Sequence, residues 1–114
     1  MNPRDLTRPH VFEKKGERTL LLLHGTGADE HDLLRLGAAL DPEASLLSPR
    51  GMVSESGMNR FFERRPDGTF VQESVLQAVD ELKDFLLAAK AEYQIQGEMF
   101  GAGFSNGANT AAAL

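Results

Sequence analysis

The stretch that decides the fold is residues 101–107, which read GAGFSNG and contain the pattern G-x-S-x-G. Its fixed positions are Gly103, Ser105 and Gly107. A Met-Phe pair precedes the stretch, and the residues that follow it are rich in alanine, a strong helix former. A strand, a sharp turn with a serine, and a helix form the context that a nucleophile elbow requires. A glycine-rich loop with a solvated serine would carry the same letters, so the motif needs support from the rest of the chain.

The spacing of this motif follows from what a serine nucleophile needs. A hydroxyl attacks poorly unless it is exposed, aimed and paired with a base. A tight turn exposes Ser105 at the edge of the sheet, with some backbone strain. The positions two before and two after the serine approach neighbouring backbone, and Gly103 and Gly107 have no side chain to obstruct it. The turn also places the N–H of Asn106 at a helix N-terminus, where the helix dipole can stabilise an oxyanion.

Composition limits the classes of protein to which the chain can belong. Its 114 residues suffice for one domain or part of one, and its 41% hydrophobic and 25% charged residues are near the averages for globular proteins. A net charge of −5 without a basic patch argues against a nucleic-acid partner. No apolar run reaches about eighteen residues, so no transmembrane helix is predicted.

The start of the chain and its rare residue types give three further expectations. The first ten residues are polar and lack the apolar core of a secretory signal. Cysteine is absent, which fits a reducing compartment and predicts a cytoplasmic protein. Three dispersed histidines argue against a metal site, and no metal or other cofactor is expected.

Two strands are predicted before the first glycine-rich loop. Val11 and Phe12 begin a short extended piece, a polar turn follows over residues 14–17, and residues 19–23 form a second strand, so a hairpin is expected. The second strand, TLLLL, is apolar without alternation, which is typical of a strand buried on both faces of a parallel sheet. A short buried helix would look similar, but the stop at His-Gly favours a strand.

Two amphipathic helices are predicted further along. The first starts near Glu30 or His31 and ends before Asp41, and its apolar stripe is formed by leucines. These leucines are Leu33, Leu34, Leu36 and Leu40. The second helix spans residues 72–93, where apolar residues recur at steps of three and four. They are Val75, Val79, Leu82, Leu86, Ala89 and Tyr93.

A third strand is predicted over residues 45–48, and residues 52–68 read as a long irregular loop. Phe61 and Phe62 in this loop either border a site or plug back into the core. The order strand, helix, strand, loop, helix, strand, helix predicts a three-layer α/β fold with a mostly parallel sheet. No repeat or linker divides the chain, so residues 1–114 are assigned to a single domain.

Several stretches of the chain lead to one family. They are LLLLHGTGADEHDL at residues 20–33, SPRG at 48–51, RFFER at 60–64 and GFSNGAN at 103–109. Together they resemble the phospholipase/carboxylesterase branch of the α/β-hydrolases, near acyl-protein thioesterases and small bacterial carboxylesterases. The resemblance runs from about residue 19 to the last residue. It implies an α/β-hydrolase fold and the hydrolysis of carboxylic esters or thioesters through an acyl-enzyme.

The resemblance also implies a role for each matching residue. Ser105 would be the nucleophile, and the backbone N–H groups of Asn106 and Thr26 would be the oxyanion donors. A loop that contains Gly25 can bring a backbone N–H to face the elbow, so the residues themselves agree with this assignment. His24 is a candidate for the catalytic base. The histidine of the family's His-Gly pair is not in the triad, however, so His24 is expected to hold the loop by hydrogen bonds.

The sequence departs from the family in its triad. In α/β-hydrolases the triad residues follow the chain order Ser, then Asp or Glu, then His. Nine residues follow Ser105, none of them acidic or histidine, and His10, His24 and His31 all precede it. The triad acid and base are therefore missing from these residues, as are the strands that would flank the elbow strand. We predict the N-terminal portion of a larger hydrolase domain, inactive as an isolated chain.

Three functions are compatible with these features. The first is a serine hydrolase of small esters or thioesters, whose acid and base come from residues outside this sequence. The second is an inactive hydrolase fragment that pairs with a second chain, or with its own copy, through an open sheet edge. The third is a phosphate-binding domain that uses the glycine-rich loop at residues 25–29, but neither common phosphate-loop motif is present.

Overall fold

The computed structural model describes residues 6–55, 57–63, 65, 67, 69 and 71–103. Within them, one sheet has the strand order β1-β3-β2-β6 and a two-stranded ribbon pairs β4 with β5. The elements are β1 (His10–Glu13), β2 (Thr19–Leu23), α1 (Leu34–Leu40), β3 (Ser45–Pro49), β4 (Val53–Glu55), β5 (Met58–Arg60), α2 (Gln72–Glu92) and β6 (Met99–Gly103). β2 runs parallel to β3 and to β6, and β1 runs antiparallel to β3, which confirms the predicted mostly parallel sheet.

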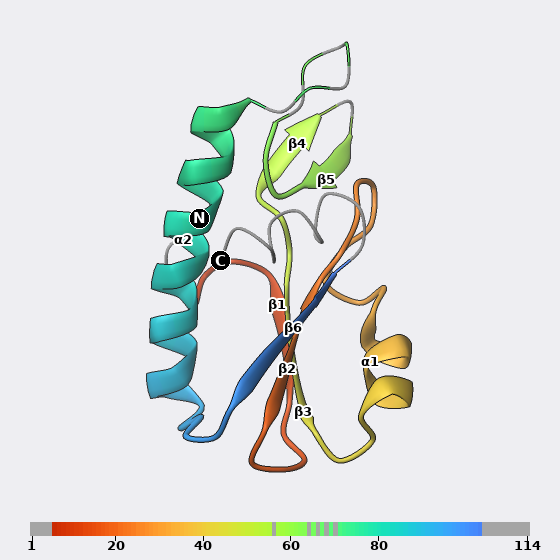
Figure 1. Ribbon diagram of the computed structural model, residues 1–114, viewed down its shortest axis with the longest axis vertical. Coiled ribbons are helices and arrows are strands. Elements are labelled where there is room, and N and C mark those ends of the chain that lie inside the picture. The colour runs from red at the N-terminus through yellow and green to blue at the C-terminus, as the bar shows by residue number, and fades with distance from the viewer. Residues whose placement is uncertain are drawn as a thin grey trace.

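The sheet forms the middle of three layers. Figure 1 shows α2 on one face of the sheet and α1 on the other. The parallel strands end at the upper edge in this view, and the β4–β5 ribbon lies beyond that edge. Loops that follow parallel strands meet at one edge of a sheet, which is where α/β folds place their ligand sites. We therefore expect the functional site at this edge of the sheet.

β1 and β2 do not form the predicted hairpin. β1 pairs instead with β3, where Val11 lies opposite Ser48 and Phe12 opposite Leu47. β3 occupies one edge of β2 and β6 occupies the other, so no edge of β2 remains for β1. The prediction was wrong because the turn between the two strands is compatible with either arrangement, and only the competing strands decide between them.

α1 is shorter than predicted and turns a different face toward the sheet. It begins at Leu34, and its buried residue is Gly37. A Cβ built on Gly37 would lie 2.9 Å from a methyl group of Leu22, so the helix packs where glycine leaves room for the strand. Leu36 is 37% exposed and Leu40 is 61% exposed, so the predicted leucine stripe is wrong for these two positions.

Residues 52–68 are more ordered than the predicted irregular loop. They contain the β4–β5 ribbon, in which Ser54 lies opposite Asn59, and Gly57 has a φ of +79° at the turn. The two strands are too short for their alternation to be visible in the sequence. Phe61 and Phe62 after the ribbon are buried, which confirms the alternative that they plug back into the core.

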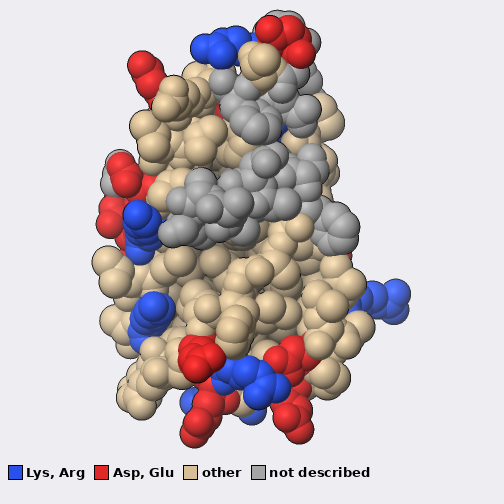
Figure 2. Space-filling view, in the orientation of Figure 1, with Lys and Arg blue, Asp and Glu red and all other residues tan. Residues whose placement is uncertain are grey.

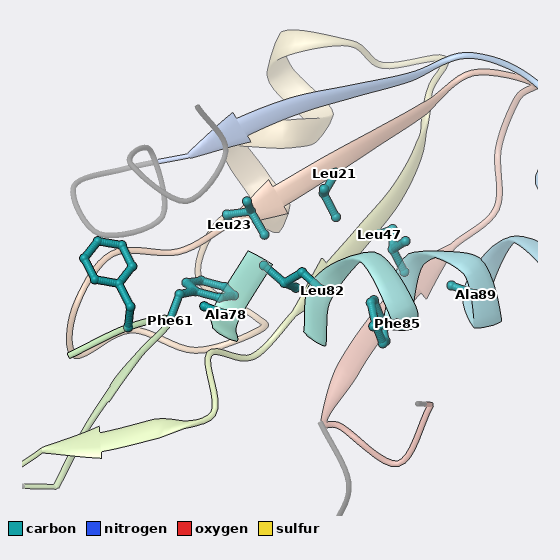
Figure 3. Packing of buried hydrophobic residues seen from close by; sticks show 9 residues of the cluster. Leu21, Leu23, Leu47, Phe61, Ala78, Leu82, Phe85 and Ala89 are labelled. Carbon is teal, nitrogen blue, oxygen red and sulfur yellow. The ribbon is translucent and has the colours of Figure 1, made fainter. Parts of the chain in front are cut away.

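α2 confirms the helix predicted over residues 72–93 and supplies one side of the main core. Its buried residues are Ala78, Val79, Leu82, Phe85 and Ala89. Figure 3 shows Leu82 and Phe85 packed among Leu21, Leu23 and Leu47 from the sheet. The sequence assigned Leu86 to the buried stripe, but Phe85 is fully buried and Leu86 only partly so.

Two features of the described surface are a cluster of charges at the lower end and an exposed strand edge. Figure 2 shows charges of both signs gathered at the lower end, where Figure 1 places the loops that precede the parallel strands. β6 lies at the edge of the described sheet, and its Phe100 is 50% exposed. In the part of the chain that the structure describes, no helix has the length and apolar character needed to cross a bilayer.

Candidate active site

The loop after β2 starts beside the strand that leads to the predicted nucleophile. The register places Leu23, the last residue of β2, opposite Gly103, the last residue of β6. The loop that begins at His24 therefore starts beside the point where the chain leaves β6. The predicted strand before the elbow is confirmed as β6. Ser105, Asn106 and Gly107 lie outside the described residues.

His24 is buried and bonded through both ring nitrogens. Its exposed fraction is 1%. The N–H of Gly51 donates to Nε2 at 2.9 Å, so this nitrogen carries no proton. Nδ1 therefore carries the proton and donates it to the carbonyl oxygen of Gly25 at 2.7 Å. The His24 ring also packs against Phe61, with 4.8 Å between ring centroids. This contact and the two hydrogen bonds together fix the orientation of the His24 ring.

Burial lowers the pKa of His24 below its ordinary value of 6.5, outweighing the Gly25 carbonyl and the carboxylates of Asp29 and Asp32, which raise it. A buried imidazolium would not be hydrated, which disfavours the charged form of the ring. Protonation of Nε2 would also break the hydrogen bond that this nitrogen accepts from Gly51. At a pH just below 6.5, the folded protein therefore keeps more of this imidazole neutral than an unfolded chain does.

The lowered pKa of His24 predicts that stability falls in mild acid. Below about pH 6.5 the unfolded chain takes up a proton that the folded ring resists, until the pH reaches the lower folded-state pKa. The free energy of unfolding should decrease across this range by at most about 1.4 kcal/mol per pH unit from this group. Urea denaturation between about pH 5 and pH 8 measures it. In His24→Asn, which has no titrating ring, an unchanged slope would contradict the assignment.

The turn after His24 is anchored by Asn59 of the ribbon. The N–H of Gly27, whose φ is +86°, donates to the main-chain oxygen of Asn59 at 3.0 Å. The side-chain amide of Asn59 donates to the carbonyl oxygen of Ala28 at 3.2 Å. The N–H of Ala28 donates to the carbonyl oxygen of Gly25 at 3.2 Å, closing the turn. Thr26 thus lies between two fixed residues.

Among the described residues, the hydroxyl and the main-chain N–H of Thr26 take no part in the hydrogen bonds that close this turn. Its hydroxyl oxygen is buried and has no hydrogen-bond partner among the residues that the structure describes. In the described part of the chain, the N–H groups of Gly27 and Ala28 donate hydrogen bonds, whereas that of Thr26 donates none. The turn therefore leaves one main-chain donor available.

An ion pair holds the far end of the same loop. The guanidinium of Arg50 binds the carboxylate of Glu30 through two parallel hydrogen bonds of 2.7 and 2.9 Å. The Glu30 side chain is 8% exposed. Burial by itself would raise the pKa of Glu30, but the hydrogen bonds from Arg50, a backbone hydrogen bond and the charge of Arg50 together outweigh burial, and the pKa is lowered. The pair therefore stays ionised and joins the loop after β2 to the loop after β3.

The N-terminal segment supports Arg50 from behind. The N–H of Arg50 donates to the carbonyl oxygen of Pro9 at 2.8 Å, and the buried Arg8 guanidinium donates to the carbonyl oxygen of Arg50 at 3.2 Å. Desolvation lowers the pKa of Arg8 to about 10, and the carboxylate of Glu81 partly offsets that effect. Arg8 therefore stays charged at neutral pH.

Sequence reasoning found one part of this arrangement and missed another. It singled out His24, Gly25, Thr26 and Gly103, and the structure brings their segments together at one edge of the sheet. It gave no role to Glu30, Arg50 or Asn59. The SPRG stretch was the available signal for Arg50, because it contributed to the resemblance, but nothing in it indicated a partner. Within the described ranges, no group of three or more histidine, aspartate or glutamate side chains is placed to hold a metal ion.

Several known proteins that are similar to the chain are named as hydrolases or carboxylesterases. It is 49% identical over 107 residues to the Bacillus subtilis (strain 168) protein named "Putative hydrolase MhqD", a match that covers 92% of this chain and 54% of that protein. The carboxylesterase of Bacillus cereus is 46% identical with a TM-score of 0.89, and the match covers 96% of this chain and 53% of that one. A carboxylesterase from Mesorhizobium loti is 32% identical with a TM-score of 0.88, over 96% of this chain and 55% of that one.

No protein-family model matches the chain. The chain spans about half the length of the relatives it matches, which is consistent with an amino-terminal half. The mostly parallel sheet, and the TM-scores and identities to two carboxylesterases, agree with the resemblance seen in the sequence. The chain has the α/β-hydrolase fold, and it is similar to about half the length of bacterial carboxylesterases.

Proposed function

We propose that the chain supplies the nucleophile and both oxyanion donors of a serine hydrolase that cleaves carboxylic esters or thioesters. Ser105 Oγ attacks the carbonyl carbon, the bond to the leaving alcohol or thiol breaks, and water then hydrolyses the acyl-enzyme. The N–H groups of Thr26 and Asn106 stabilise the negative oxygen formed in each step. The observation that carries the proposal is the pairing of Leu23 with Gly103, which starts the Thr26 loop beside the strand leading to Ser105.

His24 is a supporting residue in this proposal, not the base. A base must offer a ring nitrogen lone pair to the serine hydroxyl. The Nε2 lone pair of His24 already accepts the Gly51 N–H, and Nδ1 carries the proton donated to Gly25. The supporting roles of Gly25, Gly103 and Gly107 are likewise proposals, as is the origin of the triad acid and base in residues outside these 114.

A cavity beside the site offers volume for part of a substrate. It has a volume of about 400 Å³ and lies between α2 and the segment that contains the ribbon. Phe61 contributes to its wall and also packs against the His24 ring, so this one side chain connects the cavity to the loop that begins at His24. Met52, Val53 and Val71 offer apolar contacts to the acyl or alcohol part of an ester, while charged side chains line other parts of the cavity. The charged side chains are Arg8, Glu63, Glu73 and Glu81.

Labelling of Ser105 by a fluorophosphonate, read by intact mass, tests the proposal. We would compare the 114-residue chain with a chimera in which it replaces the matching residues of the Bacillus subtilis relative, which supplies the rest of the fold. A single adduct is expected on the chimera, and none on the chain alone or on the Ser105→Ala chimera, because the base is supplied by the added half. A folded chimera that stays unlabelled would falsify the proposal.

The exposed edge of β6 favours a second function, that of an inactive fragment that pairs through this edge. Phe100 is half exposed there, and an apolar strand edge invites pairing with another chain. Size-exclusion chromatography with light scattering separates the alternatives. The fragment function predicts oligomers of the chain that Phe100→Lys reduces, whereas a monomer at all concentrations would exclude it.

A further inference from the structure

We infer that Arg50 and Asn59 are positioning residues that hold the Thr26 N–H at the oxyanion, a role that rests on the proposed function. Neither residue touches the reacting atoms in this assignment. Both bind the loop at residues 24–30 from the segment that runs from the end of β3 through the ribbon. Together we call their contacts the loop clamp.

Arg50 fixes the far end of the loop. Its two parallel hydrogen bonds to Glu30 have the fork geometry of a guanidinium–carboxylate pair, which the ammonium group of a lysine cannot reproduce. The next residue, Gly51, binds the near end of the loop by donating its N–H to His24. Two consecutive residues therefore hold both ends of a loop that contains two glycines and would otherwise be free to move.

Asn59 fixes the middle of the loop. Its main-chain oxygen accepts the Gly27 N–H and its side-chain amide binds the Ala28 carbonyl, so the peptide groups after Thr26 cannot rotate without breaking one of these bonds. Because the Gly27 N–H donates to Asn59, it is not available to compete with the Thr26 N–H for the oxyanion. The Thr26 N–H is then the donor of the turn that an oxyanion can use.

The two anchors are coupled through a close backbone contact. A Cβ built on Gly51 would lie 2.4 Å from the carbonyl carbon of Arg60, so the start of this segment and the end of the ribbon are in direct contact. Arg50 precedes one side of the contact and Asn59 precedes the other. The clamp therefore behaves as one unit, and weakening either anchor is expected to loosen the same loop.

The energetic role follows from the requirements of an oxyanion hole. Its donors must lie 2.7–3.1 Å from the oxygen of the transition state, and a displacement of about 1 Å can cost about 100-fold in rate. A loosened clamp leaves the N–H present but misplaced for part of the time. The expected effect is therefore a lower kcat with little change in KM, smaller than the loss of an oxyanion donor itself.

The chain contains a matched control for each anchor. Arg18 binds Asp41 with the same two-bond geometry, at 2.7 and 2.8 Å, in the loop that precedes β2 at the opposite end of the strands. Ser54 lies directly opposite Asn59 on the ribbon and is exposed. Arg18→Lys therefore matches Arg50→Lys, and Ser54→Ala matches Asn59→Ala.

Two measurements on these four variants test the inference. In the full chain, amide hydrogen exchange of residues 24–30 should quicken by about tenfold or more in Arg50→Lys and Asn59→Ala and stay unchanged in the controls. In the chimera, kcat and the rate of fluorophosphonate labelling should fall by about 10- to 100-fold in the same two variants, with KM within about twofold. Asn59→Ala removes one hydrogen bond and is the milder variant, so it remains informative if Arg50→Lys does not fold.

The outcomes separate the clamp from the proposed function. Unchanged exchange of the loop in Asn59→Ala would overturn the clamp, whatever the activity of the chimera. Faster exchange with unchanged kcat would overturn the positioning role, because the loop would then move without consequence. A chimera that is unlabelled before any clamp substitution would overturn the proposed function and the oxyanion role with it, while the exchange contrast still decides whether Arg50 and Asn59 hold the loop.

Discussion

Replacing Ser105 by alanine in the chimera is expected to lower kcat for a small ester by about 10⁴- to 10⁶-fold. Loss of the nucleophile removes the acyl-enzyme route, and in a serine protease such losses fall in this range. The measurement is the hydrolysis of a chromogenic ester under saturating substrate, with the concentration of folded protein checked by its far-UV circular dichroism. KM is not informative in this variant, because the residual reaction follows another route.

A serine elsewhere on the chain provides the control for this experiment. Ser54 is exposed on the ribbon, and Ser54→Ala should leave kcat unchanged. Residual activity of Ser105→Ala within about tenfold of the parent would show that Ser105 is not the nucleophile. Equal losses in both variants would instead point to a structural effect of the substitutions.

Phe85→Ala is expected to lower the free energy of unfolding by about 3–5 kcal/mol. Phe85 is fully buried between α2 and the sheet, so the substitution removes a large apolar side chain and leaves a cavity. The ring also meets His10 edge-on at 5.2 Å and lies 5.6 Å from the guanidinium carbon of the buried Arg8, so two polar neighbours lose a contact as well. Chemical denaturation of the chain measures the loss.

The matched control for Phe85 lies two residues further along the same helix. Leu87 is 67% exposed, and Leu87→Ala should change the free energy of unfolding by less than about 0.5 kcal/mol. Both substitutions introduce alanine into one helix, so differences in helix propensity contribute little to the contrast. Similar losses in the two variants would contradict the packing of α2 described for the structure.

The sequence by itself determined those parts of the protein that depend on local patterns. β2 follows from an unbroken apolar run, α2 from apolar residues at steps of three and four, and β6 from its place before the G-x-S-x-G motif. Their order predicted a mostly parallel α/β sheet, and the motif with its His-Gly partner predicted the family. Each of these signals lies within a few consecutive residues, where backbone geometry restricts the choice.

The tertiary structure alone decided the features that depend on competition between distant segments. β1 pairs with β3 because both edges of β2 are taken, and α1 packs through Gly37 because that position lets the helix approach Leu22. The hydrogen bonds of Arg50 and Asn59 to the loop at residues 24–30 join residues 20 to 31 positions apart, and no periodicity relates them. Side-chain periodicity indicates which residues share a face but not what that face meets, so partners of this kind emerge only when the strands are assembled.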